Sequence, residues 1–273
     1  MYSIRVIVAT AKYNFIGFWR VFSLSSFALR FFMPLLSIGT AWILYYRVFN
    51  GQISSEFGQF AYTDYLTFVI LGNAVFVYIY ASIFTTGRAL FFSRLFGVLD
   101  CLFMTPMPRF AYMLGATAMG MLNASFDFLV LIGIGSAFGM NLSSINFVVF
   151  FLGLLMTLIA LFGLGLVVNG VTLTLRDRVN TSNFLQTVLY AFSGVVVPVE
   201  MMPSWARIVS MGSPLTYGLR IIRGSLYKGA GISDFQGELK VLVVMTIILV
   251  VVGIYFLGAI ERNLKKHAKL AVF

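Results

Sequence analysis

The sequence is poor in charged residues, cysteine and histidine. Only 10% of its 273 residues are charged, and its nine acidic residues are scattered. Cys101 is the only cysteine, which excludes an intrachain disulfide and a thiolate metal cluster. His267, the only histidine, lies in a basic tail. We therefore expect no metal site and no catalytic set of nucleophile and base.

A phosphate-binding loop of the form Gly-x-x-x-x-Gly-Lys-Ser/Thr is also missing from the sequence. The chain itself is therefore not expected to be an enzyme that hydrolyses ATP, or to hold any cofactor. If ATP drives its activity, another chain must bind the ATP and its Mg²⁺. The net charge of +10 does not indicate nucleic-acid binding, because the basic residues lie in short segments between hydrophobic runs.

Apolar residues make up 60% of the chain, and the mean hydropathy is +0.96. Long runs without alternation predict an all-α integral membrane protein, since lipid cannot satisfy an open backbone. No repeat or hydrophilic linker divides residues 1–273, so we expect one membrane domain. Six spans are predicted, at residues 27–46, 65–86, 110–138, 147–175, 184–199 and 241–260.

The first 26 residues do not have the composition of a cleaved signal peptide. Arg5, Lys12 and Arg20 are interspersed among apolar residues, and no small-residue cleavage site follows them. We expect an amphipathic helix in the membrane interface, in contact with lipids.

Basic residues between the spans indicate the orientation of the chain. With six spans, one side collects twelve of them: Arg5, Lys12, Arg20, Arg88, Arg94, Arg109, Arg176, Arg178, Arg262, Lys265, Lys266 and Lys269. The other side balances its few basic residues with acidic ones. Both termini are therefore predicted to be cytoplasmic, and the segment between the fifth and sixth spans is predicted to face outward.

That outward segment, residues 193–224, is interrupted by three prolines. Pro198 is expected to end or kink the fifth span, and Pro203 to begin a short helix at 204–211 that Gly212 ends. Ser213 and Pro214 have the pattern of an N-cap followed by the first helical residue, which predicts a second helix at 215–226. The two helices indicate a re-entrant hairpin over residues 202–228, or else an ordinary structured outer loop.

Residues 88–104, between the second and third spans, contain no proline. Leu90, Phe91, Leu95 and Val98 recur near helical spacing, so the segment is predicted to form a cytoplasmic amphipathic helix. Such a helix either lies in the interface or offers a docking surface to a partner.

Asp127 lies deep in the third predicted span, one turn after Asn123. An ionisable group there indicates contact with substrate, with protein or with another copy, or a neutral carboxyl group. Arg30 and Arg47 bracket the first span closely enough for both to reach opposite interfaces. Gly135 and Gly139 are spaced to permit close helix approach.

Two groups of motifs resemble the ABC-2 family of exporter permeases. Ser193-Gly194, Val197-Pro198, Met202 to Trp205, Ser213 to Tyr217 and a closing arginine are similar to the family's outer segment. Residues Phe103 to Pro106 are similar to its first cytoplasmic loop. Six spans and an amphipathic start extend the resemblance over almost the whole chain.

The resemblance implies a permease subunit in the plasma (inner) membrane of a prokaryote. It would work with two ABC ATPase subunits, which bind ATP and Mg²⁺, and with a second copy of itself or a homologous permease. Residues 88–104 would be the coupling helix, and the implied ATPase-coupling residues are Arg88, Phe91, Arg94, Leu95, Asp100, Arg176, Asp177 and Arg178. The candidates for the outer gate or substrate path are Asn123, Asp127, Pro198, Pro203, Trp205, Pro214, Tyr217, Arg220 and Arg223.

Within the hairpin, Trp205, Tyr217, Arg220 and Arg223 are expected to be exposed. Arg220 and Arg223 would share one helical face, where they either bind anions together or only extend to the interface. The substrate implied is an amphiphile: a lipid-linked glycan, a glycolipid or a hydrophobic drug. The alternatives are an ion-coupled secondary transporter or channel, which would have paired broken helices and midplane charges, and an intramembrane lipid-modifying enzyme, which would have clustered acids or histidines.

Overall fold

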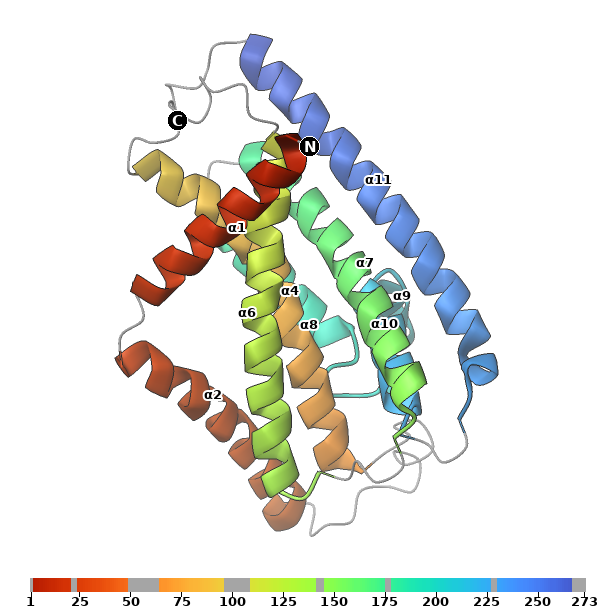
Figure 1. The fold of residues 1–273 in the computed structure, drawn as a ribbon. Coiled ribbons are helices and arrows are strands. Elements are labelled where there is room, and N and C mark those ends of the chain that lie inside the picture. The colour runs from red at the N-terminus through yellow and green to blue at the C-terminus, as the bar shows by residue number, and fades with distance from the viewer. Residues whose placement is uncertain are drawn as a thin grey trace.

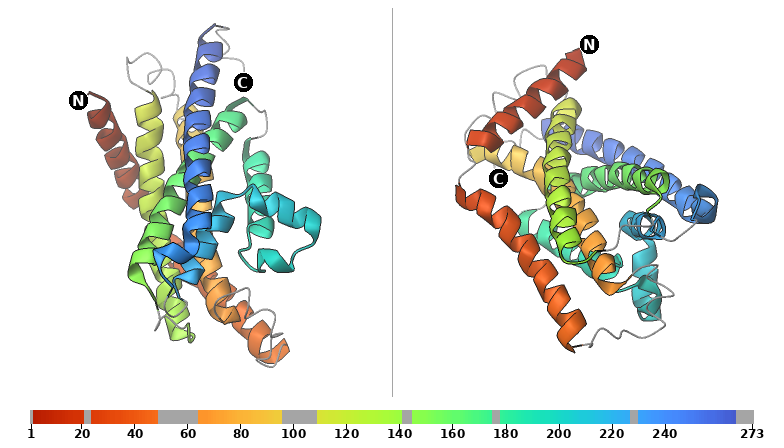
Figure 2. Two further views of the ribbon diagram at one scale, coloured as in Figure 1. Left: turned by 90° about the vertical axis from the view of Figure 1, so that its right-hand side faces the viewer. Right: turned by 60° about the horizontal axis from the view of Figure 1, so that its bottom comes forward.

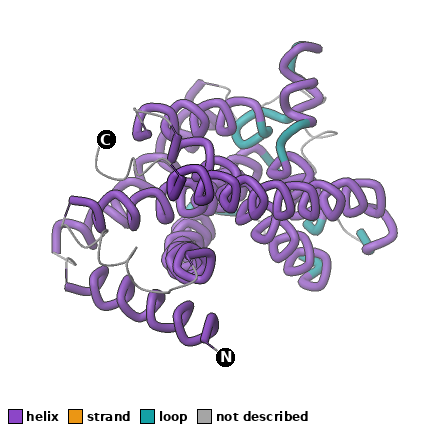
Figure 3. The backbone as a smooth tube through the Cα atoms, turned by 90° about the horizontal axis from the view of Figure 1, so that it is seen from above, coloured by secondary structure: helices purple, strands orange, loops and turns teal. Residues whose placement is uncertain are grey.

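The computed structural model describes residues 2–20, 24–48, 64–95, 109–140, 145–174, 178–226 and 230–266. All regular structure in these ranges is helical, as Figures 1 and 3 show. The long helices are α1 (Tyr2–Arg20), α2 (Leu24–Ile43), α4 (Tyr65–Leu95), α6 (Arg109–Ala137), α7 (Phe147–Thr174), α8 (Arg178–Phe192) and α11 (Gln236–Lys266). The short elements are the π-helical turn η1 (Leu44–Val48), η2 (Val199–Met201), α9 (Ser204–Met211), α10 (Pro214–Gly224) and η3 (Ile232–Phe235).

Among the described residues, four helices are long and apolar enough to cross a membrane: Tyr65–Phe84 of α4, Leu114–Ala137 of α6, Phe147–Val168 of α7, and Ile232–Phe256, which joins η3 to α11. The first and fifth predicted spans are also helical, as α2 and α8. Helix α8, however, has 15 residues and is about 22 Å long, less than the roughly 30 Å of a hydrocarbon core. The prediction of six spans is therefore confirmed for four.

Several helix ends that carry or adjoin basic residues lie close together in the bundle. The start of α1, the end of α4, the start of α6 and the end of α11 lie at one end of the bundle (Figure 1). We call this the basic end, because these helix ends carry or adjoin basic residues, and the opposite end the outer end. Helix α1 crosses α6 closely at Gly115, where an added Cβ would lie 2.6 Å from the carbonyl oxygen of Ile7.

Helix α7 packs tightly against three other helices. Ser82 of α4 donates a hydrogen bond from Oγ to the carbonyl oxygen of Leu161, at 2.5 Å. On a second side of α7, Gly153 meets the side chain of Ile221 from α10. On a third side, Gly163 meets the backbone of α11, and Gly253 of α11 meets Leu166 in return. Small residues thus allow close approach between helix backbones, which is how membrane helices gain packing energy.

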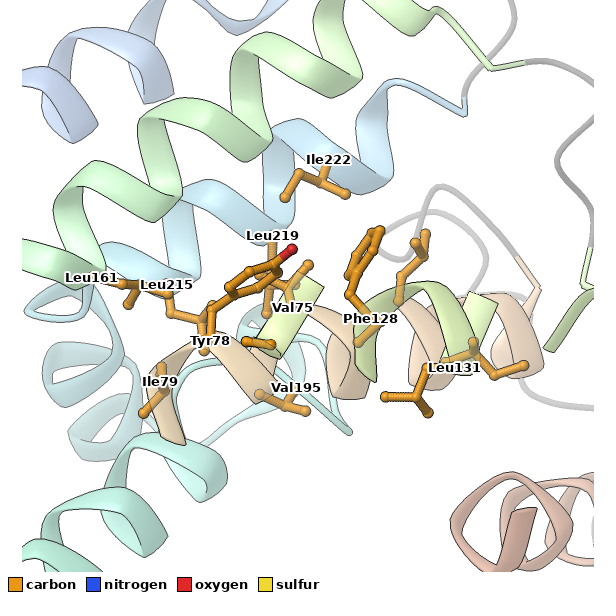
Figure 4. Close-up of a cluster of buried hydrophobic side chains, with 14 of the residues drawn as sticks. Val75, Tyr78, Ile79, Phe128, Leu131, Leu161, Val195, Leu215, Leu219 and Ile222 are labelled. Carbon is orange, nitrogen blue, oxygen red and sulfur yellow. The ribbon is translucent and has the colours of Figure 1, made fainter. Parts of the chain in front are cut away.

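The main hydrophobic core lies around α4 (Figure 4). Val75, Tyr78 and Ile79 of α4 meet Phe128 and Leu131 of α6, Leu161 of α7 and Val195 of the loop after α8. Helix α10 contributes Leu215, Leu219 and Ile222 to the same cluster. The short outer helix is therefore part of the core rather than a surface loop.

Helices α2 and α11 present apolar faces to the outside of the chain. Helix α2 lies at one edge of the bundle (Figures 1 and 2), with Phe32, Leu36 and Trp42 among its exposed side chains. Helix α11 likewise exposes Ile247 and Val251. Such surfaces suit contact with lipid or with another membrane chain.

The two glycines predicted to permit close approach have different roles. An added Cβ on Gly135 would lie 2.7 Å from Cγ2 of Ile70, so Gly135 does allow α4 to approach α6. Gly139 has open space around it and a φ of +96°, and it lies just after the end of α6. The prediction was wrong for Gly139, which provides a left-handed turn where the chain leaves the helix.

We predict that the α7–α11 crossing tolerates no extra methyl group. In Gly163→Ala the new Cβ would lie 2.9 Å from the backbone nitrogen of Val250, which cannot move without shifting α11. We expect a loss of about 2 kcal/mol of unfolding free energy, measured by thermal unfolding in detergent. Gly133→Ala on α6 is the matched control, because its Cβ meets nothing within 4 Å; it should be neutral or stabilising by up to about 1 kcal/mol. Equal stability of the two variants would contradict the tight crossing.

Candidate functional site

The outer segment begins where α8 ends, at Phe192. The Ser193 amide still bonds the carbonyl of Leu189 at 3.0 Å, and Gly194 then takes a φ of +78°, which turns the chain out of the helix. Pro198 was predicted to end this helix. That prediction was wrong, because the helix stops at the Ser193–Gly194 turn, and Pro198 instead precedes the 3-10 turn η2.

The two short helices follow the predicted proline pattern. Helix α9 begins immediately after Pro203 and ends before Gly212, as expected. Helix α10 has Ser213 at its N-cap and Pro214 in its first turn, and it ends at Gly224, two residues before the predicted end. We call η2, α9 and α10 together the outer hairpin; Figure 2 shows its α9 end standing out from the side of the bundle.

Buried hydroxyl groups hold the outer hairpin to the end of α8. Ser210 of α9 donates a hydrogen bond to the carbonyl oxygen of Phe192, and Ser193 and Ser213 share a hydrogen bond of 2.7 Å between their hydroxyls. Thr216 of α10 donates to the carbonyl of Ser210 at 2.8 Å. Sequence reasoning missed these roles, because serines and threonines in such a segment read equally well as turn residues.

Arg223 of α10 lies in the interior, with only 5% of its surface exposed. Its guanidinium donates hydrogen bonds to three backbone carbonyls: from Nη1 to Gly194 at 2.7 Å, and from Nη2 to Val195 at 2.9 Å and Phe68 at 2.8 Å. It also lies over the Phe68 ring, 3.3 Å from the centroid, a cation–π contact. The expected exposure of Arg223 was therefore wrong, because these carbonyls draw the side chain inward.

The charge on Arg223 is unusual for so buried a group. Burial lowers the pKa of its guanidinium well below the usual value, and the nearby Glu200 carboxylate opposes this shift. Arginine nevertheless remains protonated in proteins, so the site holds a buried positive charge. Gly72 of α4 provides the space, because an added Cβ there would collide with the guanidinium and with the Val195 carbonyl.

Arg220 lies one turn before Arg223 and forms an ion pair with Glu200 of η2, with 2.5 Å between Nη2 and Oε1. The two side chains are 31% and 30% exposed. Both arginines and Glu200 line a small cavity, together with Ser193, Thr216 and other residues of the hairpin. The predicted proximity of Arg220 and Arg223 is thus present, but around a cavity rather than on an open face.

The two aromatic candidates of the hairpin, Trp205 and Tyr217, differ in exposure, although both were expected to be exposed. Trp205 is exposed, and its ring packs edge-on against Phe192, with 5.5 Å between centroids. Tyr217 is only partly exposed, and its hydroxyl donates to the carbonyl of Met211 at 3.2 Å. Trp205 is therefore the aromatic side chain of the hairpin that is open to lipid or substrate.

Asn146 connects the outer hairpin to the start of α7. Its side-chain oxygen accepts from the Val148 amide at 3.1 Å, which caps α7, and its Nδ2 donates to the carbonyl of Ala230 at 3.0 Å. Its own amide bonds the Ser225 carbonyl at 2.7 Å, just beyond α10. The polar outer turn thus fixes the hairpin at its far end.

A second charged pair lies away from the hairpin, between α2 and α6. Arg30 and Asp127 are 3.2 Å apart, from Nη1 to Oδ1, with side chains 20% and 27% exposed. Arg30 also lies 5.8 Å from the ring of Phe126. Arg30 was expected to reach the interface, but the carboxylate on α6 pairs with it instead. Asn123 is half-buried one turn before Asp127.

The cytoplasmic candidates are only partly covered by the structure. Helix α4 continues without a break past residue 86 to Leu95, so the predicted separate helix at 88–104 starts as an extension of the second span. Arg88, Phe91 and Arg94 lie on this extension. Asp100 lies outside the described residues, as do Arg176 and Asp177, and Arg178 is the first residue of α8.

The described part of the chain contains no cluster of side chains suited to metal binding. Within it, no three His, Cys, Asp or Glu side chains lie close enough together to hold a metal ion. The charged groups that do come together are two cations and one carboxylate in the hairpin, and one ion pair at α2. The hairpin group has a net positive charge, whereas the pair at α2 is neutral overall.

Comparison with known families gives a match over most of the chain. Residues 5–227, from α1 to the residues just after α10, match the ABC-2 type transporter family. No curated protein matches the sequence.

We predict that Arg223 is a main determinant of hairpin stability. Arg223→Met removes a charged hydrogen-bond donor from three buried carbonyls, and we expect a loss of about 3 kcal/mol or more, measured by thermal unfolding in detergent. Arg207→Met is the matched control, since Arg207 is exposed on α9 and bonds only the Glu200 carbonyl in the described structure. It should cost at most about 1 kcal/mol. If both variants unfold together, the buried guanidinium does not hold the hairpin.

We predict that the pair between Arg30 and Asp127 attaches α2 to α6. In a double-mutant cycle, Arg30→Gln and Asp127→Asn should each destabilise the protein, and the double variant should lose about 1 kcal/mol less than their sum. The reason is that each single variant leaves one charge without its partner. Additive effects in thermal unfolding would show that the two residues do not interact.

Proposed function

The chain belongs to the ABC-2 type transporter family, and we propose that it is the membrane-spanning permease subunit of an ATP-driven exporter. The observation that carries this proposal is the match over residues 5–227, which includes the outer hairpin and the segment after α4. The apolar helices support a membrane role. The sequence contains no phosphate-binding loop, and this is consistent with ATP hydrolysis by separate subunits.

We propose that α2 and α8 complete a set of six spans and that the outer hairpin is re-entrant. Helices α9 and α10 have 8 and 11 residues, about 12 and 16 Å, so neither crosses a bilayer. A backbone that turns back at membrane depth needs polar partners from protein. The buried hydroxyls and Arg223 supply such partners, which supports this placement. In this position the hairpin closes the outer end of the pathway.

The extension of α4 is a suitable handle for an ATPase subunit. The apolar span ends at Phe84, and the helix continues from residue 85 to 95, about 16 Å further. A continuous helix transmits a push at its end to the core around Val75 and Tyr78 as rigid-body motion. Two ATPase subunits per complex, binding ATP and Mg²⁺, would contact residues 88–104 and the charged loop at 176–178.

We further propose that two copies, or one copy and a homologous permease, enclose the pathway in the plasma membrane of a prokaryote, with both termini cytoplasmic. The exposed apolar faces of α2 and α11 support contact with lipid or a second chain. The cargo would be an amphiphile: a lipid-linked glycan, a glycolipid or a hydrophobic drug.

We predict that an ATPase partner covers residues 88–104. Cys101, the only cysteine, lies in this segment and reports on it without engineering. In inside-out vesicles, a maleimide that does not cross membranes should label Cys101 in the chain expressed alone. Labelling should fall several-fold when the ATPase subunit is co-expressed, because the subunit covers the thiol. In right-side-out vesicles Cys101 should stay unlabelled, as a cytoplasmic residue would.

The charge change Arg94→Glu should weaken co-isolation of the ATPase subunit, whereas Lys240→Glu on the exposed outer part of α11 is the control and should not. Unchanged labelling in the presence of the ATPase subunit would contradict docking at this segment. Uphill transport by the purified chain in vesicles, without any ATPase, would support an ion-coupled transporter instead.

A further inference from the structure

The cavity in the outer hairpin has an unbalanced charge. Arg220, Arg223 and Glu200 line it, so two cations share one carboxylate. Glu200 forms an ion pair with Arg220, with 2.5 Å between Oε1 and Nη2. The direct partners of Arg223 are neutral carbonyls and an aromatic ring. A buried positive charge without a matching anion is costly, and carbonyl dipoles compensate it only in part. The cavity therefore favours one more negative charge.

Two arginines that line the cavity each have an unused hydrogen-bond donor. The Nε–H groups of Arg220 and Arg223 are both buried, and neither has a hydrogen-bond acceptor among the residues that the structure describes. Arg223 as a whole is 95% buried, being 5% exposed. Unsatisfied donors of this kind cost free energy unless a ligand or water accepts from them. Arg220 is held through Nη2, and Arg223 through both Nη1 and Nη2.

The size of the cavity limits what can enter it. Its volume is about 20 Å³, and a single water-sized atom needs about 10–15 Å³ on this scale. One oxygen atom fits, whereas a whole phosphate group does not. Because Arg220 and Glu200 are about one-third exposed at 31% and 30%, the rest of a ligand can remain outside.

We propose that this cavity binds one oxygen of an anionic headgroup, a phosphate or a carboxylate, which accepts hydrogen bonds from both arginine Nε–H groups. Charge-assisted bonds of this kind are the strong ones, and arginine is well shaped for oxyanions. The Glu200 carboxylate then competes with the bound anion for Arg220. Binding of the anion therefore weakens the ion pair between Arg220 and Glu200 of η2.

This site would narrow the cargo of the exporter to anionic amphiphiles, an extension that rests on the function proposed above. A headgroup leaving through the outer end would meet Arg220 first and exchange with Glu200 there. Binding itself is a property of this chain and does not depend on ATPase coupling, so the two proposals fail separately.

The test measures anion binding to the full chain alone. The protein is placed in phosphatidylcholine nanodiscs, and its thermal unfolding temperature is followed with inorganic phosphate at constant ionic strength. A second arm replaces part of the lipid with phosphatidylglycerol, without free phosphate. The first arm presents the anion from solution, and the second presents it from the membrane.

Three substitutions separate the site from general charge effects. Glu200→Gln removes the competing charge and should lower the apparent Kd by about tenfold. Arg220→Gln removes one donor and one charge and should raise it by about tenfold or more. Lys240→Gln is the control, because it removes one exposed positive charge from α11 without touching the cavity; its Kd should not change.

A response to phosphate that follows this pattern supports the site with a soluble source of the anion. The same pattern seen only with phosphatidylglycerol supports a lipid source. No response in either arm would mean that the cavity holds only water and would overturn the proposal. An equal loss of response in Arg220→Gln and Lys240→Gln would overturn it too, since the effect would be general screening. Neither result would bear on the labelling of Cys101.

Discussion

The outer end of the protein depends on one buried guanidinium. Arg223 joins three segments that are distant in the sequence: α10, the turn after α8 and the first part of α4. The Gly194, Val195 and Phe68 carbonyls all use it as a donor. Hydrogen bonds from a charged donor to buried acceptors contribute about 1.5–3 kcal/mol each, so the guanidinium adds strongly to the hydroxyl bonds and core packing that hold these segments together. The position of the hairpin, and with it the cavity, follows from that bond set.

The helices are held in two physically different ways. Around α7, Gly163 and Gly165 bring the helix against the backbones of α11 and α4, and such contacts leave little room for movement. At η2 and at α2, by contrast, charged groups also contribute: Arg220 of α10 pairs with Glu200 of η2, and Arg30 of α2 pairs with Asp127 of α6. Ion pairs can exchange partners, whereas packed backbones cannot. The structure thus combines a tightly packed centre with two ion pairs that join elements at its edge.

This division suits a permease driven from one side. The extension of α4 begins at the rigid centre, because the same helix carries Val75, Tyr78 and Ile79 in the core and Phe68 under Arg223. A displacement at the basic end of α4 would therefore reach the carbonyl that Arg223 binds at the outer end. If an ATPase subunit pushes on this end, as proposed above, the stiffness of one helix would carry the movement to the outer end.

Local sequence patterns determined the membrane class, the helical content and the short helices of the hairpin, since long apolar runs, Pro203 and the Ser213–Pro214 pair act through near neighbours. The same local reasoning predicted that the helix ends or kinks at Pro198, although it ends at the turn formed by Gly194. It also predicted that Gly139 permits close helix packing, although Gly139 forms a turn. It also predicted that Arg223 is exposed and that Arg30 extends to the membrane interface. Those outcomes were decided by partners far away in the chain, such as the Phe68 carbonyl and Asp127. The sequence alone shows that a residue can donate or carry charge; only the tertiary structure decides which acceptor lies within 3 Å, because burial and long-range contacts fix where a side chain is least costly.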